Sequence, residues 1–277
     1  THSCVARTFD ILGIGSDALR KVPVNADFEI DCGALKDAIK RDTAAGLTPF
    51  VVIGTAGAVN VGAIDDLTEL ANICGDHNLW FHVDGAYGAP AAIVAHKQAL
   101  FTGLDQADSI ALDPHKWLYA PLEAGCTLVK NPQHLLDTYS SHPEYYAFNR
   151  TDEGLTHNFY EYGLQNSRGF RALKVWMTIQ QIGSEGYAQM ISEDMDLSLR
   201  LFELANAHPE LEAISQNLSI TTFRFIPTEL QPDEKSASYL NELNERLCSE
   251  LQKGGELFLS NAIVKKQYCL RSCIVNF

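Results

Sequence analysis

The chain has 277 residues and a formal net charge of −14, with 46% apolar and 20% charged residues. This acidic balance argues against nucleic acid or a membrane surface as the main partner, because those partners select basic surfaces. No apolar run is long enough to cross a bilayer. Seven scattered cysteines without a CxxC pair predict reduced thiols, a cytoplasmic location and no metal site.

Helices and strands are expected to alternate through the first half of the chain. Asp31 predicts the N-cap of a helix that ends near Gly46, and Asp65 predicts the start of a second helix with Gly75 as its C-cap. Short apolar runs between them are typical of strands covered on both faces. This alternation predicts an α/β fold with a mostly parallel sheet. The expected strands are at residues 50–53, 80–83, 109–112 and 127–129.

The pattern changes after Gly183. We expect a long helix from Tyr187 to Ala207, a strand at 220–225, a helix near residues 239–251 and then two apolar strands. This order predicts a large domain over residues 1–183 and a smaller α+β domain over residues 184–277. The first residue is not Met and the last residues read as a strand, so we expect a longer parent protein.

An acidic residue follows one of the buried strands in His82-Val-Asp-Gly-Ala-Tyr-Gly88. A buried carboxylate needs a cation or several donors, because its desolvation is costly. Asp84 is therefore a candidate ligand-binding residue, although an Asp before Gly is more often a turn or cap residue. In open parallel sheets, ligands bind beyond the carboxyl ends of the strands, where Asp84 is expected to lie.

A lysine follows the next strand in Asp113-Pro-His-Lys-Trp-Leu-Tyr119. Pro114 has no N–H for the sheet, so the strand is expected to end before it. Lys116 then lies at the same sheet edge as Asp84, beside aromatic residues whose packing favours a neutral, nucleophilic amine. Taken alone, Lys116 is more simply read as a surface lysine. Together with Asp84 it matches the layout of enzymes that carry pyridoxal 5'-phosphate.

Through a series of ordered sequence strings, nearly the whole chain resembles the group II pyridoxal-dependent decarboxylases, the family of aromatic-L-amino-acid and glutamate decarboxylases. The resemblance implies a fold-type I large domain, related to that of aspartate aminotransferase, and a smaller C-terminal domain. Ordered strings of this length are far more specific than a single short motif. They are Thr55-Ala-Gly57, Ala63-Ile-Asp65, Trp80-Phe-His-Val-Asp84, Asp113-Pro-His-Lys-Trp117, Gly163-Leu-Gln-Asn-Ser-Arg168, Phe170-Arg-Ala-Leu-Lys174 and Leu270 to Phe277.

The resemblance also implies roles for individual residues. Lys116 is expected to form an imine with pyridoxal 5'-phosphate, and Asp84 to pair with the protonated pyridine nitrogen. His2 is expected to stack on the ring, opposite the methyl group of Ala86.

Further roles follow from the same resemblance. His115 and Thr55 are expected near the cofactor. Tyr145, with Tyr146 as the adjacent alternative, matches a loop tyrosine that protonates the substrate carbon. The remaining expected contacts, to the phosphate of a neighbouring subunit in a homodimer, come from Asn166 and Ser167.

The implied reaction removes the α-carboxylate of a small-molecule L-amino acid, with His115-Lys116-Trp117 favouring an aromatic substrate. The alternatives are an aminotransferase, an aldehyde-forming decarboxylase, or an inactive piece that retains the fold. An aminotransferase needs an arginine for the substrate carboxylate, for which Arg271 is the candidate. The chain departs from the family pattern at Asp113, which replaces a common Asn, at Val59, which replaces a Thr, and at Gly85, which replaces a common Ala. The family's phosphate-binding loop lies upstream of His2.

Overall fold

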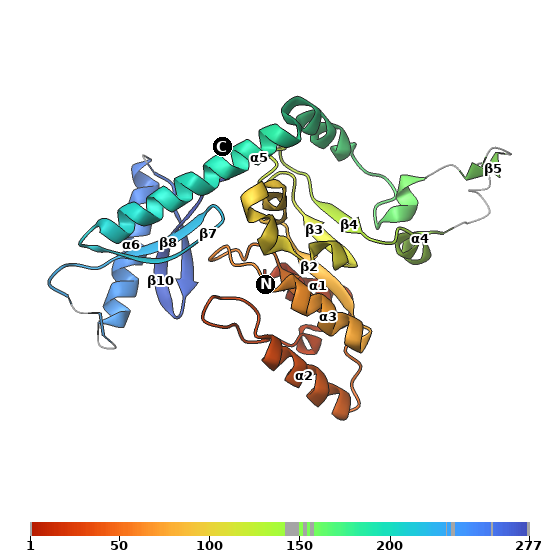
Figure 1. The fold of residues 1–277 in the computed structure, drawn as a ribbon, viewed down its shortest axis with the longest axis horizontal. Coiled ribbons are helices and arrows are strands. Elements are labelled where there is room, and N and C mark those ends of the chain that lie inside the picture. The colour runs from red at the N-terminus through yellow and green to blue at the C-terminus, as the bar shows by residue number, and fades with distance from the viewer. Residues whose placement is uncertain are drawn as a thin grey trace.

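In a computed structural model, two four-stranded sheets are joined by one long helix (Figure 1). The structure describes residues 2–141, 150–151, 154–155, 158–230, 232–233, 236–255 and 257–275. None of the helices within these ranges is long and apolar enough to cross a bilayer.

The first sheet has the strand order β1-β2-β3-β4. Strands β1 (Val51–Thr55), β2 (Trp80–Asp84) and β3 (Ser109–Leu112) run parallel, and β4 (Cys126–Val129) is antiparallel to β3. The predicted mostly parallel sheet is thus confirmed, with an antiparallel edge strand. Three parallel strands place their carboxyl ends at one edge of the sheet.

Capping residues start the helices that connect these strands. Asp31 accepts a hydrogen bond from the Ala34 N–H at the start of α2 (Cys32–Ala44), as predicted. Asp66 caps α3 (Leu67–His77) in the same way. The prediction that Gly75 ends α3 is wrong, because Asn78 adopts the left-handed conformation that closes the helix, with φ of 51°.

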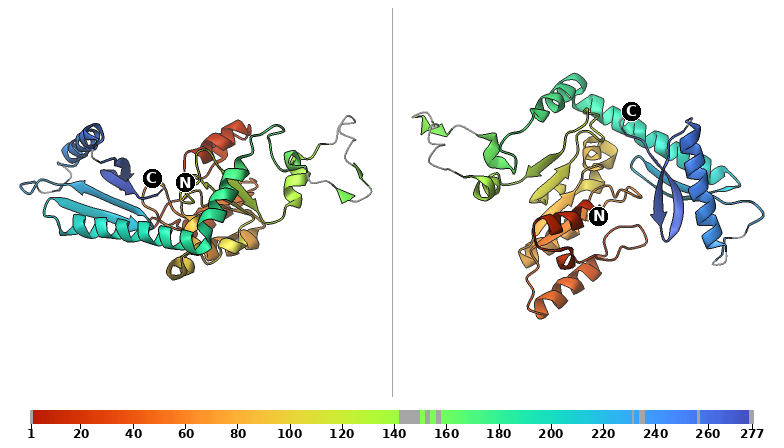
Figure 2. Two further views of the ribbon diagram at one scale, coloured as in Figure 1. Left: turned by 90° about the horizontal axis from the view of Figure 1, so that it is seen from above. Right: turned by 180° about the vertical axis from the view of Figure 1, so that it is seen from behind.

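Helix α1 (Cys4–Ile11) lies on the opposite face of the first sheet from α3 (Figures 1 and 2). Helix α4 (Gln133–Tyr139) follows β4, and a short pair of strands, β5 (Arg150–Thr151) and β6 (Gly154–Leu155), comes after it.

The second sheet is antiparallel, with the order β7-β8-β10-β9. Its strands are β7 (Leu211–Asn217), β8 (Ile220–Phe225), β9 (Ser260–Val264) and β10 (Gln267–Cys273), and α6 (Ala237–Gly254) packs on it. The predicted strand at 220–225 and the two final strands are confirmed, whereas β7 was not predicted.

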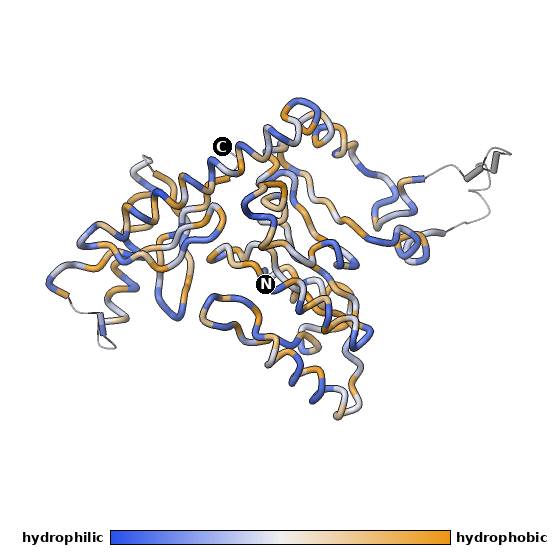
Figure 3. The backbone as a smooth tube through the Cα atoms, in the orientation of Figure 1, coloured by the Kyte–Doolittle hydropathy of each residue, from blue (hydrophilic) through white to orange (hydrophobic). Residues whose placement is uncertain are grey.

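Helix α5 (Arg171–Ala207) connects the two sheets and begins well before the predicted Tyr187. Apolar and hydrophilic residues alternate along it (Figure 3). Its helical geometry breaks at Gly183, with φ of 71° and ψ of 170°. The break coincides with the predicted domain boundary.

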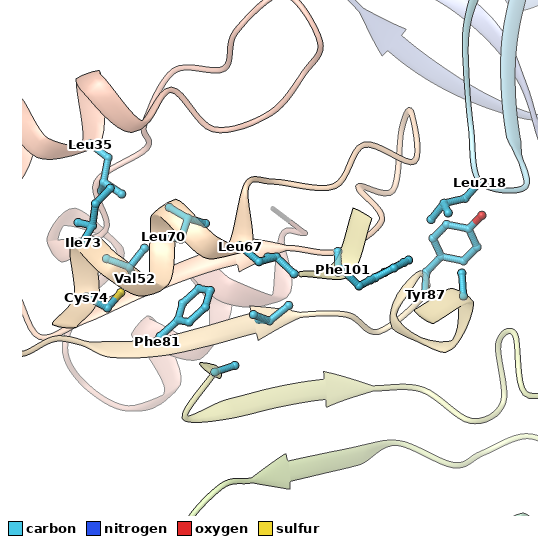
Figure 4. Packing of buried hydrophobic residues seen from close by; sticks show 14 of the residues in the cluster. Leu35, Val52, Leu67, Leu70, Ile73, Cys74, Phe81, Tyr87, Phe101 and Leu218 are labelled. Atoms are coloured by element: carbon cyan, nitrogen blue, oxygen red, sulfur yellow. The ribbon is translucent and has the colours of Figure 1, made fainter. Parts of the chain in front are cut away.

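The largest buried cluster crosses that boundary. It packs β1, β2 and α3 residues such as Val52, Phe81 and Leu70 (Figure 4). It also contains Ile191 and Met195 from α5, Leu218 from the turn between β7 and β8, and Ile220 at the start of β8. The parts of the chain before and after Gly183 therefore share one apolar cluster. Burial of apolar side chains is the main stabilising contribution to such folds.

Candidate active site

The ends of the three parallel strands bring the predicted residues to one edge. Thr55 pairs with Asp84 between β1 and β2, and Asp84 pairs with Ala111 between β2 and β3. Asp84 thus ends the central strand of the parallel set, and Lys116 follows the neighbouring strand β3. This is the edge at which α/β sheets bind ligands.

Backbone hydrogen bonds join the loops that carry Asp84 and Lys116. The Gly85 N–H donates to the Ala111 carbonyl at 3.1 Å, and the Asp113 N–H donates to the Ala86 carbonyl at 3.1 Å. The Ala86 N–H also donates to Asp84 Oδ1 at 3.3 Å. The two loops are therefore side by side and fixed in register, as the sequence predicts.

Lys116 lies in a tight turn after β3. Its N–H donates to the Asp113 carbonyl at 2.9 Å, and its Nζ lies 2.7 Å from Asp113 Oδ2. The lysine side chain is 41% exposed, so a small molecule can reach the amine. The Asp113 carboxylate, which replaces the expected Asn, is occupied by this ion pair.

The His115 side chain contacts a backbone segment. Its Nδ1 lies 2.6 Å from the Ala124 carbonyl oxygen and 3.0 Å from the Ala124 nitrogen. These contacts fix the ring orientation, and the tautomer decides which of the two contacts is a hydrogen bond.

The segment that ends at Thr55 is held by a buried carboxylate. Asp65 Oδ2 accepts the Thr55 N–H and Oδ1 accepts the Ile30 N–H, both at 2.7 Å. Burial raises the pKa of Asp65, and the two backbone hydrogen bonds oppose that shift. Asp65 therefore fixes the position of Thr55 next to Asp84.

The two loops also contact each other through aromatic side chains. Trp117 is fully buried and stacks on Tyr87, with ring centroids 4.8 Å apart and an interplanar angle of 13°. Its Nε1–H donates to Asp194 Oδ2 at 2.8 Å, and the hydroxyl of Tyr119 donates to the same oxygen. Sequence analysis predicted neither Tyr87 nor Asp194 as part of the site.

The other predicted site residues lie on other segments of the chain. His2 is exposed, and its Nδ1 accepts the Cys4 N–H at 3.2 Å. Asn166 and Ser167 are exposed on the connection before α5. Tyr145 and Tyr146 lie outside the described residues.

Comparison with known proteins adds a separate line of information. The pyridoxal-dependent decarboxylase conserved domain matches residues 1–226. An aromatic-L-amino-acid decarboxylase of Bacillus atrophaeus is 37% identical over 277 residues, covering 100% of this chain and 57% of that protein. Tryptophan decarboxylase TDC2 of Camptotheca acuminata is 30% identical, covering 99% of this chain and 55% of that protein.

A solved structure has the same fold. The crystal structure of Oryza sativa TDC with PLP and tryptamine superposes with a TM-score of 0.91 at 26% identity, covering 99% of this chain and 56% of that one. The chain therefore spans a little over half the length of the proteins that it matches.

Proposed function

Because the chain belongs to the pyridoxal-dependent decarboxylase family, we propose that its protein converts an aromatic L-amino acid into the corresponding amine and carbon dioxide, with pyridoxal 5'-phosphate as cofactor. One observation carries the proposal. Asp84 and Lys116 follow adjacent parallel strands, and the Asp113 N–H to Ala86 carbonyl bond joins their loops. A carboxylate and an accessible amine are the two groups that this cofactor requires.

The residues at the edge fit the cofactor chemically. Lys116 supplies a primary amine that solvent reaches, and Asp84 supplies a carboxylate held at the end of β2. Ala86, on the loop after Asp84, carries only a methyl group, and its carbonyl accepts the Asp113 N–H. When bound, the cofactor accepts the electron pair released from the bond between Cα and the carboxylate.

In this proposal the chain's own residues bind, orient and hold protons. Lys116 forms the covalent link to the cofactor and afterwards moves protons through Nζ. Asp84 holds a proton on the ring nitrogen, since a nearby carboxylate stabilises a cation. Thr55, fixed by Asp65, and His115, fixed by Ala124, border the same edge.

Four residues complete the proposal on the strength of the family resemblance. His2 stacks on the outer ring face, and Tyr145 gives a proton to the substrate carbon. Asn166 and Ser167 bind the phosphate of the neighbouring subunit's cofactor in a homodimer. The exposed positions of Asn166 and Ser167 support this contact. The cysteines of the described residues are free, which supports a cytoplasmic location.

An aromatic substrate is the most specific part of the proposal. The aromatic-L-amino-acid and tryptophan decarboxylases among the similar proteins support it, as does the sequence His115-Lys116-Trp117. Amine and carbon dioxide are expected from L-tryptophan, L-tyrosine or L-phenylalanine, and little product from L-glutamate.

Substitution of Asp84 in the full-length protein tests the proposed function. Asp84→Ala is expected to lower amine formation by roughly 100-fold or more, since it removes a preorganised charge next to the reacting group. Asp76→Ala removes an equal charge from an exposed position of α3 and should leave the rate unchanged. Full activity of Asp84→Ala, or a keto acid or aldehyde as the main product, contradicts the proposal.

A further inference from the structure

A buried carboxylate on α5 has no part in the proposed chemistry. Asp194 is 8% exposed, and its Oδ2 accepts the Trp117 Nε1–H at 2.8 Å and the hydroxyl of Tyr119. Burying a carboxylate is costly unless it is hydrogen bonded, and a bond to a charged group is among the stronger ones. Both donors come from the segment that directly follows Lys116.

A second α5 residue binds the same segment. The hydroxyl of Tyr187, two helical turns before Asp194, donates to the Leu118 carbonyl at 2.8 Å. Each of the three residues after Lys116 is therefore hydrogen bonded to the same face of α5. A long helix packed in a core is a rigid support for such a turn.

Trp117 also contacts the loop that follows Asp84. Tyr87 lies on that loop and stacks on the Trp117 ring, and its hydroxyl is 2.6 Å from Ser219 Oγ. Figure 4 shows Tyr87 beside Leu218 at the turn between β7 and β8. Trp117 is thus held between Asp194 on one side and the Asp84 loop on the other.

Tyr119 has a backbone conformation that needs support. Its φ of 56° is uncommon for a residue with a bulky side chain and persists only where neighbouring contacts hold it. Burial and the nearby Asp194 raise the pKa of the Tyr119 hydroxyl above its ordinary value. The Asp194 contact therefore fixes the turn on which Lys116 lies.

We infer that Asp194 is a positioning residue, which acts through Trp117 and Tyr119 to hold Lys116 beside Asp84. This inference rests on the proposed function, because it concerns the reaction of Lys116 with the aldehyde. In that reaction Nζ bonds to the aldehyde carbon and the aldehyde oxygen leaves as water. The rate depends on where Nζ is held.

The test measures this step without measuring turnover. The full-length protein is incubated with pyridoxal 5'-phosphate, the new C=N bond is reduced with added borohydride, and labelled lysines are quantified by peptide mass spectrometry. Lys253 is the internal comparison, because it pairs with Glu250 at the same (i,i+3) spacing as Lys116 with Asp113. The readout is the ratio of labelling rates, Lys116 over Lys253, in protein shown to be folded by circular dichroism.

Asp194→Ala is expected to lower this ratio by roughly tenfold, the effect of losing about one good hydrogen bond. Asp194→Asn keeps an acceptor oxygen of the same shape and should restore the ratio to within about threefold. Asp196→Asn, an exposed change on the same helix, should leave the ratio unaltered. If Asp194→Ala does not fold, Trp117→Phe and Tyr119→Phe each remove one donor and should lower the ratio.

The outcomes separate the two ideas. If unaltered protein labels Lys116 no faster than Lys253, the proposed function fails, and the inference fails with it. If Lys116 is preferred but the Asp194 variants, or the Trp117 and Tyr119 variants in their place, leave the ratio unchanged, only the positioning role is overturned. Preferred labelling that falls in Asp194→Ala and returns in Asp194→Asn supports both.

Discussion

His82 lies in β2, two residues before Asp84, and its ring contacts the neighbouring strand β3. Its Nδ1 lies 2.8 Å from Ser109 Oγ, and the same oxygen accepts the Trp80 Nε1–H at 2.8 Å. Burial lowers the pKa of His82, and the nearby Asp84 opposes that shift. Folding therefore favours the neutral form of the His82 ring.

This lowered pKa predicts a pH dependence of stability. The unfolded chain binds a proton at the ordinary pKa of 6.5, whereas folded His82 binds it only at lower pH. The free energy of unfolding should therefore fall as pH drops below about 6.5. Urea unfolding at pH 7.5 and 5.5 measures the difference, which His82→Gln should reduce. His96→Gln, at an exposed position, should leave it unchanged; an equal slope in both variants contradicts the assignment.

Sequence analysis predicted Asp84 and Lys116 at one edge because each lies at the end of a buried strand, and parallel strands end at one edge. Their roles toward a cofactor come from the family resemblance and stay predictions. It missed Asp194 because a single Asp in a long helix reads as a solvent-facing residue. A signal was nevertheless present. Ile191, Asp194, Met195 and Ser198 have the spacing of one helix face, and all four are buried. A carboxylate on an apolar face predicts a buried hydrogen-bond partner.

At the level of elements, Gly183 separates the two parts of α5. Its φ of 71° is readily adopted only by glycine. Gly183→Ala should lower the free energy of unfolding by about 1 kcal/mol or more, because a Cβ is strained in this region. Gly75→Ala lies within α3 with open space around its Cβ and should raise the free energy by about 0.5–1 kcal/mol. Denaturant titration compares the two; destabilisation by both, or by neither, contradicts the break at Gly183.

Most elements with strong periodicity or clear caps could be predicted, including β3 and β8 with their bounds. The failures have physical reasons. Strand β7 was not predicted because its one buried residue is the polar Ser215, so it lacks the alternation of apolar and polar residues that marks a half-buried strand. The predicted end of α3 at Gly75 is wrong because the exposed residues Gly75 to His77 continue the helix, and Asn78 adopts the left-handed conformation that ends it. Asn and Gly both favour that conformation, so the pattern alone does not choose between them.

At the scale of the whole molecule, Tyr87 joins the two sheets. Its buried hydroxyl contacts Ser219 Oγ and accepts the Ser219 N–H at 3.0 Å. Tyr87→Phe leaves that N–H without its partner and should lower the free energy of unfolding by about 1–3 kcal/mol. Tyr239→Phe, at an exposed position of α6, should change it little. An unaltered denaturation midpoint for Tyr87→Phe contradicts this link between the two sheets.

The arrangement of the whole chain also limits what sequence can predict. The contacts of Trp117 with Tyr87 and Asp194 bring together three segments that are distant in the chain. The predicted boundary at residue 183 follows a real change of pattern, but apolar packing continues across it. The contacts of His2, Asn166 and Ser167 stay predictions, because the family resemblance assigns them to groups beyond this chain.

The covalent link to Lys116 is the central claim, and one measurement tests it directly. The full-length protein is incubated with pyridoxal 5'-phosphate, reduced with borohydride, digested and mapped by mass spectrometry. We expect a single dominant pyridoxyl modification on the peptide that contains Lys116, and its loss in Lys116→Ala but not in the exposed-site control Lys253→Ala. A dominant modification at another lysine, or an unmodified Lys116 in unaltered protein, would contradict the claim.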